Sequence, residues 1–238
     1  MRIAYKSSLI IIILLSFSFK ISAGDLNCLF QDDAETYAAI NGIDDAVLAG
    51  WSHGSDRGVD SWRVLPGSGV NLSKAFSVFE ETDISLLGIT DSFLITPEIF
   101  IPSQYYLEFM HKYDFEADSA YYDGGQLQIS LNSGNSWSDL NLHIITGGYN
   151  QVISSAYGSP IGGELAWAGE QDSYGRVQVD LSVFVGEVIQ IRWRFVSGLD
   201  SIPQLGWRID DIRVVDSIEP ADAIFISQFE TSDFDLCF

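Results

Sequence analysis

Apolar side chains recur at every second position in several short segments, which is the spacing of a β-strand with one buried face. The clearest case is 104–116, where Leu107, Phe109, His111, Tyr113 and Phe115 share one face. The same alternation predicts strands at 126–132, 177–181, 189–195 and 207–215, with further candidates at 61–65, 75–80 and 92–96. Only the stretch 33–48 leaves room for one or two helical turns.

Glycine-rich segments separate these runs and predict turns between the strands. They lie at 123–125, 132–136, 147–148, 158–160 and 162–163. The 6 Trp, 10 Tyr and 15 Phe residues also favour pleated, half-buried strands. Alternating strands with one apolar face must cover each other, so we predict an all-β fold of two antiparallel sheets packed as a sandwich.

The first residues have the pattern of a secretory signal peptide. Arg2 and Lys6 precede an apolar run at 9–19, and 21–23 (ISA) offers a cleavage site. The alternative is a membrane anchor, but a run of about eleven residues is short of the ~20 that span a bilayer. We therefore expect a signal peptide at 1–23, a sandwich domain at 24–216 and an acidic tail at 217–238, in a secreted protein, extracellular or periplasmic, without a membrane span.

The net charge is strongly negative and limits the class of partner. The formal charge of −21 becomes −24 once residues 1–23, with three basic side chains and no acidic one, are removed. Such a field repels nucleic acid and anionic membranes and is compatible with Ca²⁺. Cys28 and Cys237 remain, and export permits a disulfide between them. Two free thiols or an intermolecular bridge are the alternatives.

Eight segments, in this order, resemble a known family. They are 91–97 (DSFLITP), 107–116 (LEFMHKYDFE), 122–130 (YDGGQLQIS), 133–137 (SGNSW), 166–169 (AWAG), 179–182 (VDLS), 191–195 (IRWRF) and 206–212 (GWRIDDI). The chain is similar to the jelly-roll accessory domains of secreted bacterial metallopeptidases, of the immune inhibitor A C-terminal type, and to MAM-like and galactose-binding-like sandwiches. The resemblance implies a jelly roll, often with structural Ca²⁺, that binds a ligand or supports a peptidase.

Motifs of hydrolytic enzymes are missing from the sequence. The three histidines, His53, His111 and His143, do not form the His-Glu-x-x-His pattern of a zinc peptidase. The serine at 54–58 (GSDRG) is not spaced as in a nucleophile elbow. His111 lies on an apolar strand face and is expected to be a hydrogen-bonded core residue. A polysaccharide hydrolase with two carboxylates stays an alternative, because 33 acidic residues always allow such a pair.

Calcium is the cofactor that the acidic residues favour, because Ca²⁺ takes oxygen ligands. The candidate ligands end one predicted strand (Glu116), lie in the loop after it (Asp118 and Asp123) or lie in the last strand (Asp210 and Asp211). A second candidate group is Asp32, Asp33 and Glu35. In the other interpretation these acids cap turns or pair with Arg192, Arg194 or Arg208.

Aromatic residues near predicted loops are the candidate ligand-binding residues, since rings stack on sugar faces. They are Trp51, Trp137, Trp167, Tyr121 and Tyr122, with a lid over the sandwich end as the alternative role. Trp193 and Trp207 are expected in the core. The function we expect is a non-catalytic, secreted domain that recognises a glycan or a protein surface. The alternatives are an accessory or separate partner of a secreted metallopeptidase, and the hydrolase named above.

Overall fold

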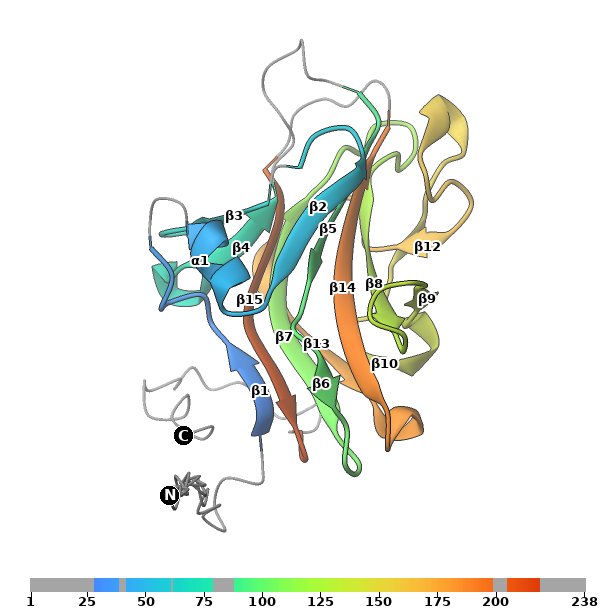
Figure 1. Ribbon diagram of the computed structural model, residues 1–238. Helices are drawn as coiled ribbons and strands as arrows, with labels where there is room; N and C mark the ends of the chain where they lie inside the picture. Colours follow the sequence, from blue (N-terminus) through green and yellow to red (C-terminus); the bar gives the residue numbers. More distant parts are fainter. Residues whose placement is uncertain (1–27, 39–41, 61, 79–87, 199–204, 219–238) are drawn as a thin grey trace, which may run out of the picture.

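Two antiparallel sheets pack face to face in the computed structural model of the protein (Figure 1), which describes residues 28–38, 42–60, 62–78, 88–198 and 205–218. The larger sheet has seven strands. In spatial order they are β10 (Ile144–Thr146), β13 (Glu170–Asp180), β7 (Tyr106–Asp114), β15 (Gly206–Val215), β4 (Ala75–Val78) and β3 (Arg63–Leu65), with β1 (Cys28–Asp32) also paired to β15.

The second sheet has six strands and faces the viewer in Figure 1. Its order is β2 (Ser52–Arg57), β5 (Thr90–Ile95), β14 (Val188–Ser197), β8 (Gly124–Ser130) and β9 (Ser138–Asp139), with β6 (Ile99–Phe100) also paired to β14. A separate hairpin joins β11 (Gln151–Val152) to β12 (Leu165–Ala166). The helical elements are α1 (Gly42–Leu48) and 3₁₀ turns at Val70–Leu72, Asn141–His143, Ala156–Gly158 and Ser182–Phe184.

Aromatic rings fill the space between the two sheets. Phe109 of β7 meets Trp193 of β14 edge to face, with ring centres 5.4 Å apart, and so connects one sheet to the other. Trp193 and Trp207 are fully buried, as predicted. The fit is close at Gly125, where an added Cβ would lie 2.7 Å from the Trp207 ring. This strand therefore needs glycine beneath the indole.

His111 is a core histidine, which confirms the expectation from its strand position. It is 1% exposed, and its Nδ1 accepts a hydrogen bond from Nε1 of Trp207 at 3.3 Å. Burial lowers the pKa of the imidazole to about 3, so the ring is neutral at physiological pH.

A small second cluster holds the β11–β12 hairpin against the outer face of the six-stranded sheet. It consists of Ile153, Ile161, Ala166, Ala168 and Val196, with Tyr121 packed against it. Val196 is an outward residue of β14, because Trp193 and Phe195 fill the inward positions. The hairpin therefore forms a raised border beside β8, and Figure 1 shows β12 on that side of the sheet.

The strongly alternating segments all form strands, which confirms the predicted antiparallel sandwich. The structure adds β2 (SHGSDR), whose sequence has no apolar face to reveal it. The predicted signal peptide, most of the predicted tail and Cys237 lie outside the described residues, so the Cys28–Cys237 pairing stays a prediction. In the ranges that the structure describes, no helix is both long and apolar enough to cross a membrane.

Candidate functional site: the outer face of the six-stranded sheet

Two neighbouring strands place planar polar side chains on the outer face of the six-stranded sheet. On β8, Leu127 and Ile129 point into the core, so Gln126 and Gln128 point outward. On β14 the same alternation turns Arg192 and Arg194 outward. Gln126 lies opposite Arg194 and Gln128 opposite Arg192 in the strand register.

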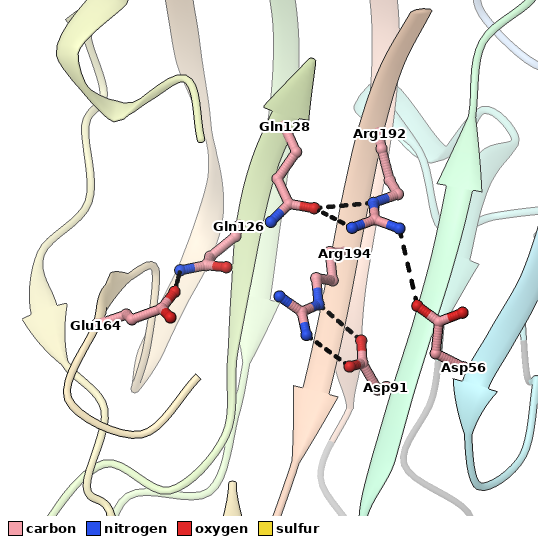
Figure 2. A network of polar contacts seen from close by, with 7 residues as sticks. All are labelled: Asp56, Asp91, Gln126, Gln128, Glu164, Arg192 and Arg194. Carbon is pink, nitrogen blue, oxygen red and sulfur yellow. Dashed lines mark hydrogen bonds and ion pairs between the residues drawn. The ribbon is translucent and has the colours of Figure 1, made fainter. Parts of the chain in front are cut away.

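Side chains from the neighbouring strands and the hairpin extend this surface (Figure 2), and Phe93 and Trp137 lie beside Arg192 on it. We call it the polar face, and it comprises Asp56, Asp91, Phe93, Gln126, Gln128, Trp137, Glu164, Arg192 and Arg194.

The side chain of Arg194 is held in place by a two-pronged contact with Asp91 of β5. Its Nε donates to Oδ1 at 2.7 Å and its Nη2 donates to Oδ2 at 2.6 Å. This hydrogen bonding raises the pKa of Arg194, because it stabilises the charged guanidinium. Bidentate pairs of this kind fix orientation as well as charge. The guanidinium plane is therefore preorganised before any ligand arrives.

Arg192 lies against two aromatic rings. Its guanidinium carbon is 4.5 Å from the centre of the Trp137 ring and 5.6 Å from that of Phe93. Its Nε donates to Oε1 of Gln128 at 2.8 Å, and its Nη2 donates to the same oxygen. Burial lowers the pKa of Arg192 to about 10, so the side chain still carries its charge at neutral pH.

Asp56 is the exposed counter-ion of Arg192. Its Oδ2 lies 3.9 Å from Nη1, and its side chain is 63% exposed, against 9% for Asp91. The two carboxylates thus differ in role. Asp91 is built into the surface, whereas Asp56 sits at its solvent edge.

Gln126 connects the face to the hairpin border. Its Nε2 donates to Oε2 of Glu164 at 2.9 Å and to the carbonyl of Leu165 at 3.1 Å. Its Oε1 is buried and accepts no hydrogen bond from any described residue. Figure 2 shows this oxygen on the side of the amide that faces Arg194. The face therefore retains hydrogen-bonding capacity that its own residues do not use.

Phe93 and Gly54 form the opposite border. A Cβ at position 54 would lie 3.0 Å from Cζ of Phe93, so the ring rests directly on the β2 backbone. Phe93 and Trp137 are both half-buried, which leaves part of each ring open to solvent. Fixed donors and acceptors beside partly open rings are suited to recognising a ligand that carries hydroxyl groups.

The outer face of the seven-stranded sheet also carries a polar network, but that network closes on itself. Glu108 accepts from Nε of Arg213 at 3.0 Å and from Nε2 of Gln178 at 2.7 Å, and Arg176 lies 3.8 Å away. Gln178 in turn accepts from Thr146 at 3.0 Å. These contacts stabilise the sheet, and the half-buried Tyr174 lies on the same face with its ring centre 5.0 Å from Nζ of Lys112.

Asp210, one of the two calcium candidates in the last strand, accepts hydrogen bonds from protein donors at both oxygens. Its Oδ2 accepts from the amide of Val70 at 2.8 Å and from Oγ of Ser73 at 3.0 Å, and Oδ1 accepts from the amide of Asp211 at 2.8 Å. Burial is the main cause that raises the pKa of Asp210 to about 7. Asp211 occupies a bulge with φ of 50°.

The calcium candidates that follow β7, which are Glu116, Asp118 and Asp123, are not gathered with Asp210 and Asp211. Asp210 lies opposite Met110, while Glu116 lies beyond the end of β7, so the two positions are separated by about 20 Å along the strand. Asp123 accepts from the amide of Gly198 at 2.7 Å, and Asp118 is exposed. Within the described ranges, no group of three or more acidic, histidine or cysteine residues is placed to hold a metal ion.

The second calcium group has structural partners as well. Asp32 accepts from Nε1 of Trp51 at 2.7 Å, from the amide of Ala34 at 2.8 Å and from the Tyr37 hydroxyl. Asp33 accepts from the amide of Glu35 at 3.0 Å. These contacts match the turn-capping role that was the alternative. Arg192 and Arg194 pair instead with Asp56 and Asp91, which were not among the candidate acids.

The structure corrects the position of three predicted ligand-binding aromatics. Trp51 and Trp167 are 2% and 1% exposed and belong to the main core, so neither ring is open to a ligand. Tyr122 is 8% exposed and its hydroxyl contacts Ser119 at 3.0 Å. Tyr121 is half-buried against the hairpin cluster. Of the five, only Trp137 lies on the polar face.

Sequence reasoning missed the centre of the face. Gln126, Gln128, Arg192 and Arg194 occupy alternate positions opposite apolar residues, which identifies them as outward but not as neighbours. Their proximity depends on the pairing of β8 with β14, and these two strands are far apart in the sequence. The sequence did contain one signal for this face, which is a pair of polar residues at positions i and i+2 in each of the two strands.

No protein-family model matches the chain, and no curated protein matches it. Similar solved structures include the K2 cleaved adhesin domain of Lys-gingipain, with 16% identity, TM-score 0.46 and coverage of 80% of this chain and 98% of that one. The K1 cleaved adhesin domain of Lys-gingipain from Porphyromonas gingivalis W83 has 17% identity and a TM-score of 0.44, and the match covers 79% of this chain and 98% of that one. TmCBM61 in complex with β-1,4-galactotriose has 12% identity and a TM-score of 0.44, and the match covers 80% of this chain and 99% of that one. These are similarities of chain path, and at such values they carry nothing about the ligand of this chain.

Proposed function

We propose that the protein is a secreted, non-catalytic domain that binds an extracellular glycan on the polar face. The observation that carries the proposal is that two register pairs, Gln126–Arg194 and Gln128–Arg192, lie side by side on this face. Asp91 fixes the guanidinium of Arg194, and the guanidinium of Arg192 lies over the ring of Trp137. A solvated sheet face ordinarily needs no such ordering. Here the side chains have already lost the freedom that binding would otherwise remove.

The chemistry of the face suits hydroxyl groups. A sugar hydroxyl is both a donor and an acceptor, so it can use guanidinium N–H groups as donors and amide or carboxylate oxygens as acceptors. The C–H face of a sugar ring can lie on an aromatic ring such as Trp137 or Phe93. The row from Gln126 to Asp56 crosses three strand spacings, or about 14 Å, which suits an extended glycan segment.

Binding is favoured over hydrolysis because the carboxylates of this region are already engaged. Asp91 is bound at both oxygens by Arg194, and Glu164 accepts from Gln126. Asp139 accepts from the amide of Asn141 at 2.6 Å and from the Tyr149 hydroxyl at 3.0 Å. Support of a separate secreted peptidase is compatible with glycan binding, but no contact of the described residues favours it specifically.

Calcium stays part of the proposal as a stabilising ion. Asp211 lies near Asp33, and burial followed by the repulsion from Asp33 raises its pKa to about 6. A divalent cation would relieve this repulsion, with Glu35 also close by. The residues as placed do not form a complete metal site, so binding would require them to move.

Affinity electrophoresis against a panel of neutral polysaccharides (β-1,4-galactan, xylan, β-glucan and mannan) tests the glycan proposal. At least one polysaccharide should retard the wild-type protein, and Trp137→Ala should lower its affinity by about tenfold or more. The control is Phe100→Ala, which removes a 54% exposed ring on β6 and should leave retardation unchanged. Absence of retardation by every polysaccharide, or equal retardation of the Trp137→Ala variant, would refute the proposal.

A further inference from the structure

The two positive charges of the polar face are both matched by carboxylates. Arg194 is bound at both oxygens of Asp91, and Arg192 has Asp56 at 3.9 Å. Glu164 adds a third carboxylate beside Gln126. The face therefore presents three negative groups against two positive ones, on a chain with a formal net charge of −21.

An anionic ligand would need an uncompensated cation, and Arg192 is the group that could supply one. Its Nη1 points toward the solvent edge, where Asp56 lies (Figure 2). A ligand carboxylate or sulfate approaching Nη1 would meet Asp56 and be repelled. A hydroxyl group carries no charge and meets no such repulsion.

We infer that the polar face selects uncharged glycans, and that Asp56 sets this selectivity by neutralising Arg192 at the point where an anion would bind. The inference rests on the proposed glycan-binding function and names the ligand class of that site. Asp56 acts through Arg192, so it is a specificity-determining residue, and Asp91 is unsuited to that role because it holds Arg194 in place.

Asp56→Asn is the appropriate variant. The side chain is 63% exposed and makes one long contact, so its replacement should leave the fold intact. The matched control is Glu187→Gln, which removes one negative charge from an exposed position outside the polar face. Both variants change the net charge equally, so only a local effect of Asp56 can separate them.

The experiment uses a neutral polysaccharide that the wild-type protein binds, together with two derivatives of the same backbone. One is lightly carboxymethylated, and the other is hydroxyethylated to the same degree as a control for size. The wild-type protein should bind the hydroxyethylated form normally and the carboxymethylated form at least about tenfold more weakly. Asp56→Asn should recover at least about fivefold for the carboxymethylated form alone, and the recovery should fade in high salt. Glu187→Gln should behave as the wild type does.

The outcomes separate this inference from the function on which it rests. Equal or tighter wild-type binding of the carboxymethylated form would overturn the selectivity while leaving glycan binding intact. No recovery in Asp56→Asn, or the same recovery in Glu187→Gln, would overturn the role of Asp56. If no neutral polysaccharide binds at all, the proposed function itself fails.

Discussion

The guanidinium of Arg192 lies over the ring of Trp137, with its central carbon 4.5 Å from the centre of the ring. One residue comes from β14 and the other from the loop that precedes β9. The contact covers an arginine whose side chain is only 10% exposed, and it orients the ring that we assign to sugar stacking. Stability and recognition therefore use the same pair of residues.

Arg192→Lys should weaken glycan binding by about tenfold, or about 1.4 kcal/mol. Lysine keeps the charge but has neither the flat face that lies against Trp137 nor the fork that donates to Gln128. Affinity electrophoresis provides the measurement. Arg57→Lys, an exposed change at the end of β2, is the control and should bind normally. Equal affinities of the two variants would show that the planar group is not required.

Asp91→Ala should cost ~3–5 kcal/mol in the free energy of unfolding, because it leaves Arg194 partly buried without its carboxylate. Replacing both residues by leucine should cost less than Asp91→Ala alone, since no charge is then left unpaired. Urea denaturation measures both values. A double leucine variant that costs as much as Asp91→Ala, or more, would contradict the coupling of the two side chains.

Lowering the pH from 8 to about 6.5 should stabilise the protein. The folded pKa values of Asp210 and Asp211, about 7 and 6, exceed the 3.8 of an unfolded aspartate, so the folded state binds more protons in this range. Below about 6.5 the buried neutral His111, with its pKa of about 3, acts in the opposite direction because the unfolded chain takes up its proton. Thermal melts across this interval measure the slope.

Two neighbouring substitutions separate this effect from the overall charge. Asp211→Asn should raise stability at pH 8 by on the order of 1–2 kcal/mol and flatten the pH dependence. Asparagine also tolerates the positive φ of 50° at this position. Asp210→Asn removes the same charge but turns an amide toward the donors Val70 and Ser73, so it should destabilise the fold. Equal shifts in both variants would contradict this account.

Calcium should raise the melting temperature of the wild-type protein, and EDTA should reverse the increase. The same titration of Asp211→Asn should give a smaller shift, because the carboxylate that we assign to the ion is absent. A melting temperature that is unchanged by metal removal would end the calcium proposal.

The sandwich was predictable because inter-sheet packing leaves a period-two record in each strand. His111 illustrates this, since its place between Phe109 and Tyr113 on one strand face predicted a buried, hydrogen-bonded ring. The edge strand β2 has no alternating apolar pattern, because its residues are Gly54 and polar neighbours. The apolar contact comes from Phe93 of β5, whose ring lies against Gly54. Its register follows from pairing with β5 and not from its own pattern.

The site was less predictable for two physical reasons. Trp51 and Trp167 lie near strand ends, and the sequence does not reveal that such residues turn inward to fill the space between the sheets. Arg194 and Gln126 are outward residues of strands that are distant in the chain, and only the strand order makes them neighbours. Of the five predicted ligand-binding aromatics, Trp137 alone lies on the polar face.

The position of the bound glycan is the central claim, and NMR titration tests it most directly. Adding oligosaccharides of the neutral polysaccharide that binds should shift the side-chain amide signals of Gln126 and Gln128 and the indole signal of Trp137. The buried indoles of Trp193 and Trp207 should respond less. Shifts confined to the outer face of the seven-stranded sheet, around Met110 and Tyr174, with Gln126, Gln128 and Trp137 unchanged, would contradict the account.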